Sequence, residues 1–172
     1  MSAPGSRASV PTPRPELQLL RPDHAPALLS FEETNRAYFA ATVPDRGDAY
    51  FRDFDARHHA LLDEQAAGVC RFHVLVGDGG EIVGRINLLD LADGCAELGY
   101  RIAEKATGQG LATWAVRQVC DLAVTTYGLT GLRAATTHDN PGSRAVLTRT
   151  GFVPVGDVRL GGVPGTSFAL TL

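Results

Sequence analysis

Two glycines one residue apart are the first feature of this sequence that could do chemistry. Gly108 and Gly110 stand in the stretch LGYRIAEKATGQGLATWAV, residues 98–116, between an apolar strand-like run and a segment with helical spacing. Glycine allows a ligand to approach the backbone closely, and the N–H groups at a helix start attract anions. One interpretation is a pyrophosphate cradle formed by the N–H groups of residues 106–112, with Lys105 adding positive charge. The other is a tight turn that binds nothing.

Two familiar nucleotide-binding loops do not fit this spacing. A Walker A loop requires G-x-x-x-x-G-K-[ST], and the sequence contains no such string. A dinucleotide fingerprint requires a third glycine where Thr113 stands, and it follows the first strand of a parallel sheet. Here the preceding strand is expected to be antiparallel to its neighbour. A nucleotide-dependent oxidoreductase is therefore the weakest of the functions considered.

A second chemistry-bearing stretch, HDNPGSRAVLTRTGF, begins at residue 138. Asn140 suits the N-cap of a short helix, with proline at the first helical position and glycine closing the helix. The loop K-x-x-G-x-G-x-A, residues 105–112, together with N-P-x-S-x-x-V-x-x-x-x-G-F, residues 140–152, resembles the GNAT superfamily of acyl-CoA N-acyltransferases. The likeness is greatest to the RimJ/RimL-like branch, the ribosomal-protein N-acetyltransferases, and it covers residues 16–172.

This resemblance implies a coenzyme site between two strands. Strands 95–103 and 131–138 would separate at their C-terminal ends, and the pantetheine arm of acetyl-CoA would lie between them. Backbone groups of Tyr100, Arg101 and Ile102 would bind the arm, and Asn140 would contact it. The pyrophosphate would be held by the loop residues Lys105, Ala106, Thr107, Gly108, Gln109 and Gly110. Acetyl-CoA would be the co-substrate, and no metal is implied.

Two side chains are the candidates for moving protons. Glu97 is an acid within an apolar strand, and partial burial would raise its pKa enough for it to act as a base through one water. The alternative is a glutamate that faces solvent, because strand alternation puts it on one face with Gly99. For the acid, many GNAT enzymes use a tyrosine where this chain has Leu147, whereas the RimJ/RimL-like branch uses a serine, here Ser143. A serine that only bonds to backbone is the alternative.

The elements that must position these residues follow from hydrophobic periodicity and turn residues. Strands are expected at 17–22, in a hairpin over 70–91, at 95–103 and 131–138, and in a final hairpin over 152–172. Helices are expected within 24–66, across 109–127, and after Asn140. The fold class is α+β: a mixed, mostly antiparallel twisted sheet of about seven strands, with helices on both faces and a central β-α-β coenzyme-binding unit.

Composition narrows the class of protein. The chain has 172 residues, 44% hydrophobic and 20% charged, with a net charge of −3, which predicts one globular domain over 16–172 and argues against nucleic-acid binding. Residues 1–15, rich in Pro, Ser and Gly, are expected to be a flexible tail. The sequence contains no apolar run of 18 residues, so no membrane-spanning helix is expected. Three scattered cysteines, Cys70, Cys95 and Cys120, suggest reduced thiols and a cytoplasmic protein.

We therefore predict an N-acetyltransferase that moves an acetyl group directly from acetyl-CoA to a primary amine. The acceptor would be a protein N-terminus or a small-molecule amine, lying against aromatic side chains of the early helices: Phe31, Tyr38, Phe39 and Phe51. These helices could also support a homodimer. The alternative is a non-catalytic acyl-CoA-binding or sensing module on the same fold. This alternative is favoured by Leu147, which stands where many GNAT enzymes have the tyrosine acid. A covalent route through Cys95 ranks below direct transfer, because no partner histidine has a recognisable spacing.

Overall fold

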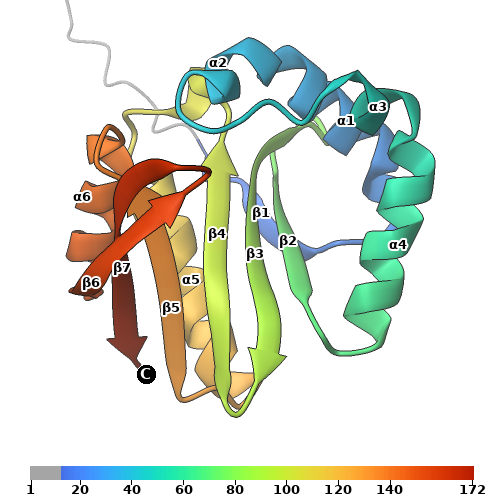
Figure 1. The fold of residues 1–172 in the computed structure, drawn as a ribbon. Helices are drawn as coiled ribbons and strands as arrows, with labels where there is room; N and C mark the ends of the chain where they lie inside the picture. The colour runs from blue at the N-terminus through green and yellow to red at the C-terminus, as the bar shows by residue number, and fades with distance from the viewer. Residues whose placement is uncertain (1–12) are drawn as a thin grey trace, which may run out of the picture.

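Among the residues that the structure describes, one seven-stranded sheet forms the centre of the fold (Figure 1). The computed structural model describes residues 13–172, so the expected tail lies mostly outside the described residues. The strands, in the order β1-β2-β3-β4-β5-β7-β6 across the sheet, are β1 (Glu16–Leu19), β2 (Arg71–Val76), β3 (Ile82–Ala92), β4 (Cys95–Ile102), β5 (Gly131–Thr137), β7 (Val163–Thr171) and β6 (Val153–Leu160). Every adjacent pair is antiparallel except β4 and β5, which are parallel. The predicted mixed, mostly antiparallel α+β sheet is confirmed.

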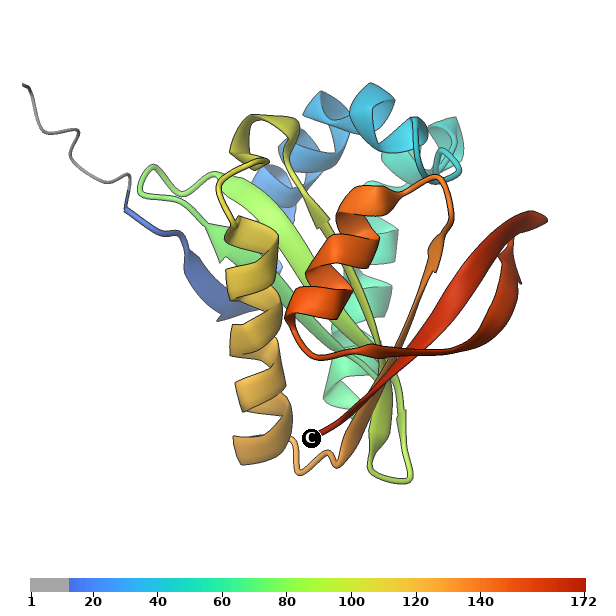
Figure 2. The same cartoon turned by 90° about the vertical axis from the view of Figure 1, so that its left-hand side faces the viewer.

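In the described part of the chain, six α-helices flank this sheet. They are α1 (Ala25–Thr34), α2 (Arg36–Ala40), α3 (Asp48–Arg52), α4 (Phe54–Ala66), α5 (Leu111–Thr125) and α6 (Pro141–Arg149). Helices α5 and α6 lie on one side of the sheet and α4 on the other, as the two views show (Figures 1 and 2). Among residues 13–172, no helix is both long enough and apolar enough to cross a membrane.

Helix α5 links the two parallel strands and makes the central β-α-β unit. Its residues Ala115, Val116, Val119 and Ala123 are buried, at the three- and four-residue steps that place side chains on one face. On β4 the buried residues Ala96 and Leu98 alternate with the exposed Glu97. One face of β4 therefore packs into the core beside α5. The other face, which carries the exposed Glu97, lies on the opposite side of the sheet from α5.

The predicted elements between residues 24 and 66 divide into more pieces than their periodicity indicated. The first helical pattern breaks at Asn35, whose side chain donates to the carbonyl of Phe31 at 2.9 Å and accepts from the N–H of Glu104 at 2.9 Å. Asparagine that bonds to local backbone competes with helix continuation. The turn at Asn35 thereby ties α1 and α2 to the loop that follows β4.

Buried His73 makes the stability of this fold sensitive to acid. Its ring nitrogens bond to the Ile86 carbonyl at 3.2 Å and to the Tyr127 hydroxyl at 2.7 Å, and burial lowers its pKa from 6.5 to about 4. As pH falls through 6.5, this histidine takes up a proton in the unfolded chain but not in the folded one. Its contribution to the stability of the fold is therefore complete above pH 6.5 and is lost as pH falls toward 4. We expect the free energy of unfolding to fall by about 2 kcal/mol between pH 7 and pH 5 for this reason.

Urea unfolding at the two pH values measures this effect. His73→Gln should lose about 2 kcal/mol less than the parent over that interval, whereas the exposed His59→Gln should behave like the parent. An equal loss in the parent and in His73→Gln would contradict the assignment.

Candidate active site

Strands β4 and β5 separate partway along their length. Their pairing covers only Cys95 with Gly131, Ala96 with Leu132, and Glu97 with Arg133. Beyond these, residues 98–102 and 134–137 form no pair with each other, although each strand continues to pair with its other neighbour. The sheet thus contains a gap whose walls carry free backbone groups, as the sequence predicted for strands 95–103 and 131–138.

The direction of the backbone groups on β4 identifies those that line this gap. The N–H of Ala103 donates to the carbonyl of Val83 on β3 at 2.8 Å. In an antiparallel pair successive residues point alternately toward and away from the partner strand. The backbone groups of Arg101 therefore point toward β3, and those of Tyr100 and Ile102 point into the gap. Of the three predicted arm-binding residues, Tyr100 and Ile102 offer backbone groups to a ligand there, and Arg101 does not.

The glycine loop presents free backbone N–H groups at the start of α5. Gly108 and Gly110 have φ of 75° and 72°, a left-handed conformation that favours glycine. The N–H of Thr107 is bonded to Glu104 and that of Trp114 to Gly110, but the N–H groups of residues 108–113 have no acceptor among residues 13–172. Six consecutive donors at the positive end of a 15-residue helix form a site suited to an anion.

The gap and the loop open into one cleft of about 670 Å³. Nine of the predicted site residues line it: Tyr100, Arg101, Ile102, Ala106, Thr107, Gly108, Gly110, Asn140 and Ser143. Tyr38 and Phe39 of α2 line it as well, whereas Phe31 is buried in the core. Lys105, Gln109 and Glu97 are exposed and do not line the cleft.

A hydrogen bond joins the two walls of this cleft. The Tyr100 hydroxyl donates to Oγ of Ser143 at 3.1 Å, and Asn140 caps α6 by accepting from the N–H of Ser143 at 3.2 Å. Burial raises the pKa of the Tyr100 phenol, although its bond to Ser143 opposes this. Sequence reasoning missed the Tyr100 side chain, because no local pattern reveals a partner 43 residues away. Leu147, at the tyrosine position of the resembled family, is 1% exposed in the core.

Glu97 lies at the foot of the gap and not within the cleft. It occupies the last pair before the strands part, opposite Arg133 on β5 and Leu89 on β3. Its side chain is exposed on the face opposite to Tyr100, because successive side chains of a strand alternate. Cys95, two residues earlier, lies at the paired end of β4, whereas residues 100–102 at the other end line the cleft.

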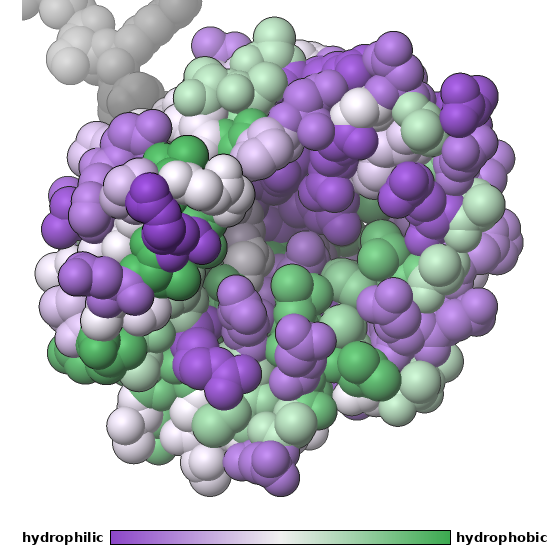
Figure 3. All heavy atoms as spheres, in the orientation of Figure 1, coloured by the Kyte–Doolittle hydropathy of each residue, from purple (hydrophilic) through white to green (hydrophobic). Residues whose placement is uncertain are grey.

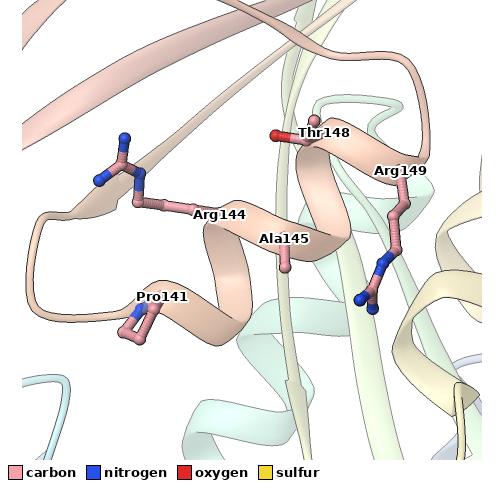
Figure 4. Close-up of a pocket in the computed structure, with 5 residues that line it drawn as sticks. All are labelled: Pro141, Arg144, Ala145, Thr148 and Arg149. Atoms are coloured by element: carbon pink, nitrogen blue, oxygen red, sulfur yellow. The ribbon is translucent and has the colours of Figure 1, made fainter.

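Helix α6 contributes one basic side chain to the cleft, that of Arg149. A pocket on this helix is lined by Pro141, Arg144, Ala145, Thr148 and Arg149, and its two arginines project in different directions (Figure 4). Ala145 and Arg149 also line the main cleft. Arg149 therefore adds a positive charge to the cleft that contains the glycine loop, which suits a ligand with more than one phosphate.

A buried carboxylate surrounded by arginines lies on the other face of β4. We call Glu32, Arg46, Arg85 and Arg101 the Glu32 cluster. Oε1 of Glu32 accepts from Arg85 at 2.8 Å, and Oε2 accepts from Arg101 at 3.1 Å with Nε of Arg46 at 3.5 Å. Burial alone would raise the pKa of Glu32, but the attraction of the three guanidinium groups outweighs it and holds that pKa below its usual range. The cluster is ionised at neutral pH and carries more positive than negative charge.

Comparisons with known proteins agree with this geometry. Residues 14–153 match the family described as acetyltransferase (GNAT) domain. An uncharacterized N-acetyltransferase p20 from Bacillus licheniformis is 30% identical over 91 residues, 52% of this chain, and the match spans about half of that relative's length, 51%.

Two solved structures have the same fold. A ribosomal-protein-S5-alanine acetyltransferase from Vibrio fischeri superposes with a TM-score of 0.84 at 20% identity, covering 90% of this chain and 91% of that one. RimJ from Mycobacterium smegmatis, in complex with CoA-disulfide, has a TM-score of 0.81 at 24% identity, covering 90% and 80%.

Proposed function

This chain belongs to the acetyltransferase (GNAT) domain family, and on that premise we propose that it transfers an acetyl group from acetyl-CoA to the primary amine of a protein N-terminus. The family predicted from the glycine loop and the NPGS stretch is confirmed, and solved members of the RimJ/RimL-like branch share the fold. One of them is a ribosomal-protein-S5-alanine acetyltransferase, which supports the choice of a protein acceptor. A small-molecule amine is the other acceptor considered.

The observation that carries this proposal is the continuity of the free loop N–H groups with the split between β4 and β5. Residues 108–113 offer six N–H donors without acceptors among residues 13–172, which fits a pyrophosphate. Tyr100 and Ile102 offer strand-like backbone groups to an extended amide-bearing arm. A volume of about 670 Å³ accommodates such a ligand. Acetyl-CoA would supply the acetyl group as a thioester.

The chain's own residues then have distinct tasks. A backbone N–H in the gap, aimed at the acetyl carbonyl oxygen, stabilises negative charge as it develops there. We propose that Glu97 receives the amine proton through water, since its exposed carboxylate stands at the foot of the gap. Ser143 is the proposed proton donor to the leaving sulfur, and Tyr100, bonded to its Oγ, orients it.

Incubating the protein with acetyl-CoA and a panel of peptides and small amines, while following free thiol, tests this proposal. We expect thiol release that depends on the amine, together with a mass gain of one acetyl group on the acceptor. In Glu97→Gln, kcat/KM should fall by about tenfold at neutral pH. Binding of acetyl-CoA without release of thiol on any amine would instead favour the non-catalytic acyl-CoA-binding module.

Ser143→Ala and Tyr100→Phe should each lower kcat by no more than about tenfold, because a thiolate with a pKa near 8.5 leaves readily without full protonation. Since the two hydroxyls act through one hydrogen bond, the double variant should be little worse than Ser143→Ala alone. Steady-state kinetics on the three variants measures this coupling. Effects that simply multiply would show that Tyr100 does not act through Ser143.

The cellular location, the extent of the catalytic domain and the oligomeric state are also proposals. Three cysteines are free, at Cys70, Cys95 and Cys120, which supports a reducing, cytoplasmic environment. A single catalytic domain over 16–172 is supported by the one continuous sheet. A homodimer receives less support from the early helices than the sequence indicated, because Phe31, Phe39, Tyr50 and Phe54 are buried within the chain.

A further inference from the structure

The charge of the Glu32 cluster is unbalanced beside the cleft. Three guanidinium groups face one carboxylate, so the cluster carries two more positive than negative charges. Asp45, which lines the adjoining hollow, and Asp48 are not paired with the cluster, because both are paired with Arg36, at 2.7 and 2.8 Å. The bond to Arg36 lowers the pKa of Asp45 to about 2, so that pair is ionised and already satisfied. Together with Arg36, Asp45 and Asp48, these seven residues carry one positive charge in excess.

Arg101 connects this charge to the cleft that would hold the coenzyme. Arg101 and Phe39 line both that cleft and a smaller hollow bounded by Glu32, Arg36 and Arg46. The Arg101 guanidinium stacks over the Phe39 ring at 4.6 Å, which fixes its position. Its side chain is 21% exposed, whereas that of Arg85 is only 5% exposed. Arg101 is therefore the member of the cluster placed to meet a ligand in the cleft.

The small hollow itself cannot hold the ligand. Its volume is about 10 Å³, enough for one water molecule at most. Figure 3 shows hydrophilic side chains gathered around a depression under the α2–α3 segment, beside the upper part of β4. An anionic group must therefore reach the cluster from the main cleft, which Arg101 and Phe39 also line.

We propose that the acceptor amine carries a carboxylate close to its reacting nitrogen, and that Arg101 binds this carboxylate. The inference rests on the proposed acetyl transfer and names the substrate class. Glu32 positions Arg101 and keeps its planar guanidinium oriented for a carboxylate. Arg46 adds a second positive charge at the rim. Polyamine acceptors, which carry several positive charges, are disfavoured by the same field.

Matched acceptors that differ in one carboxylate test this proposal. The peptides Ala-Asp-Ala-Ala and Ala-Asn-Ala-Ala, both amidated at the C-terminus, isolate an acidic second residue. Alanine and alaninamide isolate the carboxylate of a free amino acid, and spermidine represents the polycations. We expect kcat/KM for the carboxylate-bearing member of at least one pair to be about tenfold higher, with a preference that weakens as salt rises. The pair that shows it identifies whether a peptide or an amino acid is the source of the carboxylate.

Three variants separate the role of Arg101 from a general loss of charge. In Arg101→Gln the ratio between the two members of the preferred pair should fall from about tenfold to about one, and in Arg46→Gln by about threefold. Arg46 is 32% exposed and pairs at 3.5 Å, so its replacement keeps the test available if Arg101→Gln is poorly folded. Arg52→Gln removes an exposed arginine of α3, paired with Asp53, and should keep the full ratio.

Calorimetric binding of the same acceptors to the CoA-loaded protein measures the preference without turnover. Absence of thiol release with every acceptor would overturn the proposed function, while a binding preference that Arg101→Gln removes would still support the carboxylate site. Ratios within twofold of one for both pairs, in turnover and in binding, would overturn this inference. A preference for spermidine would also overturn it.

Discussion

Glu32→Ala is expected to destabilise the protein by about 3–5 kcal/mol. The carboxylate is 1% exposed and is the only acidic partner that residues 13–172 provide for Arg85 and Arg101. Without this carboxylate, the guanidinium groups of the cluster repel one another where little water reaches them. The free energy of their desolvation is then no longer offset by an opposite charge. Urea or thermal unfolding of the variant measures the loss.

The neighbouring residue supplies a matched control for this substitution. Glu33 occupies the next position of α1 and is exposed, so Glu33→Ala changes the same chemistry without breaking a buried pair. Its cost should stay within about 0.5 kcal/mol. Glu32→Gln should be intermediate, because the amide oxygen still accepts a hydrogen bond while the negative charge is lost. Equal stability of Glu32→Ala and Glu33→Ala would show that the arginines find other partners.

The backbone of the site was predictable from the sequence because its signals are local. Alternation and β-rich composition indicated the strands on both sides of the gap, and the stripe from Leu111 to Leu122 indicated the helix between them. Asn140 and Pro141 marked the start of α6, where the structure has an N-cap bond to Ser143. Each of these features depends on neighbours within a few residues.

The side-chain chemistry of the site was less predictable, because it depends on distant pairs. Glu32 meets Arg85 across 53 residues and Arg101 across 69. In the sequence, Glu32 stands beside Glu33 in a helix whose face toward the sheet is otherwise apolar, so nothing distinguishes the buried acid from the exposed one. The same holds for Tyr100, whose hydroxyl bonds to Ser143 on another element. The family resemblance also assigned the backbone of Arg101 to the coenzyme, whereas the alternation of β4 turns that backbone toward β3.

The second large effect concerns the glycine loop, whose conformation an L-residue rarely adopts. Gly108→Ala and Gly110→Ala are each expected to weaken acetyl-CoA binding about tenfold, and the double variant about a hundredfold. The reason is that a Cβ in the left-handed region costs roughly 1–2 kcal/mol per residue. An added Cβ would meet nothing within 4 Å at either position, so the cost comes from φ and not from a clash. We expect the loop of the variants to relieve this strain by turning its N–H groups away from the anion. Calorimetry with acetyl-CoA and with CoA measures the change in Kd.

Gly162→Ala is the control that separates strain from binding. Gly162 lies between β6 and β7 with φ of 81° and also has nothing within 4 Å of an added Cβ. It should therefore lose a similar amount of unfolding free energy while its Kd for acetyl-CoA stays within about twofold of the parent. If Gly108→Ala and Gly110→Ala lost only stability, as Gly162→Ala should, the six free N–H groups would not be the pyrophosphate site. All three variants introduce the same backbone strain, but only the two loop variants lie among the free N–H donors of residues 108–113. Weaker binding in the loop variants, with unchanged binding in Gly162→Ala, would therefore assign acetyl-CoA binding to those donors.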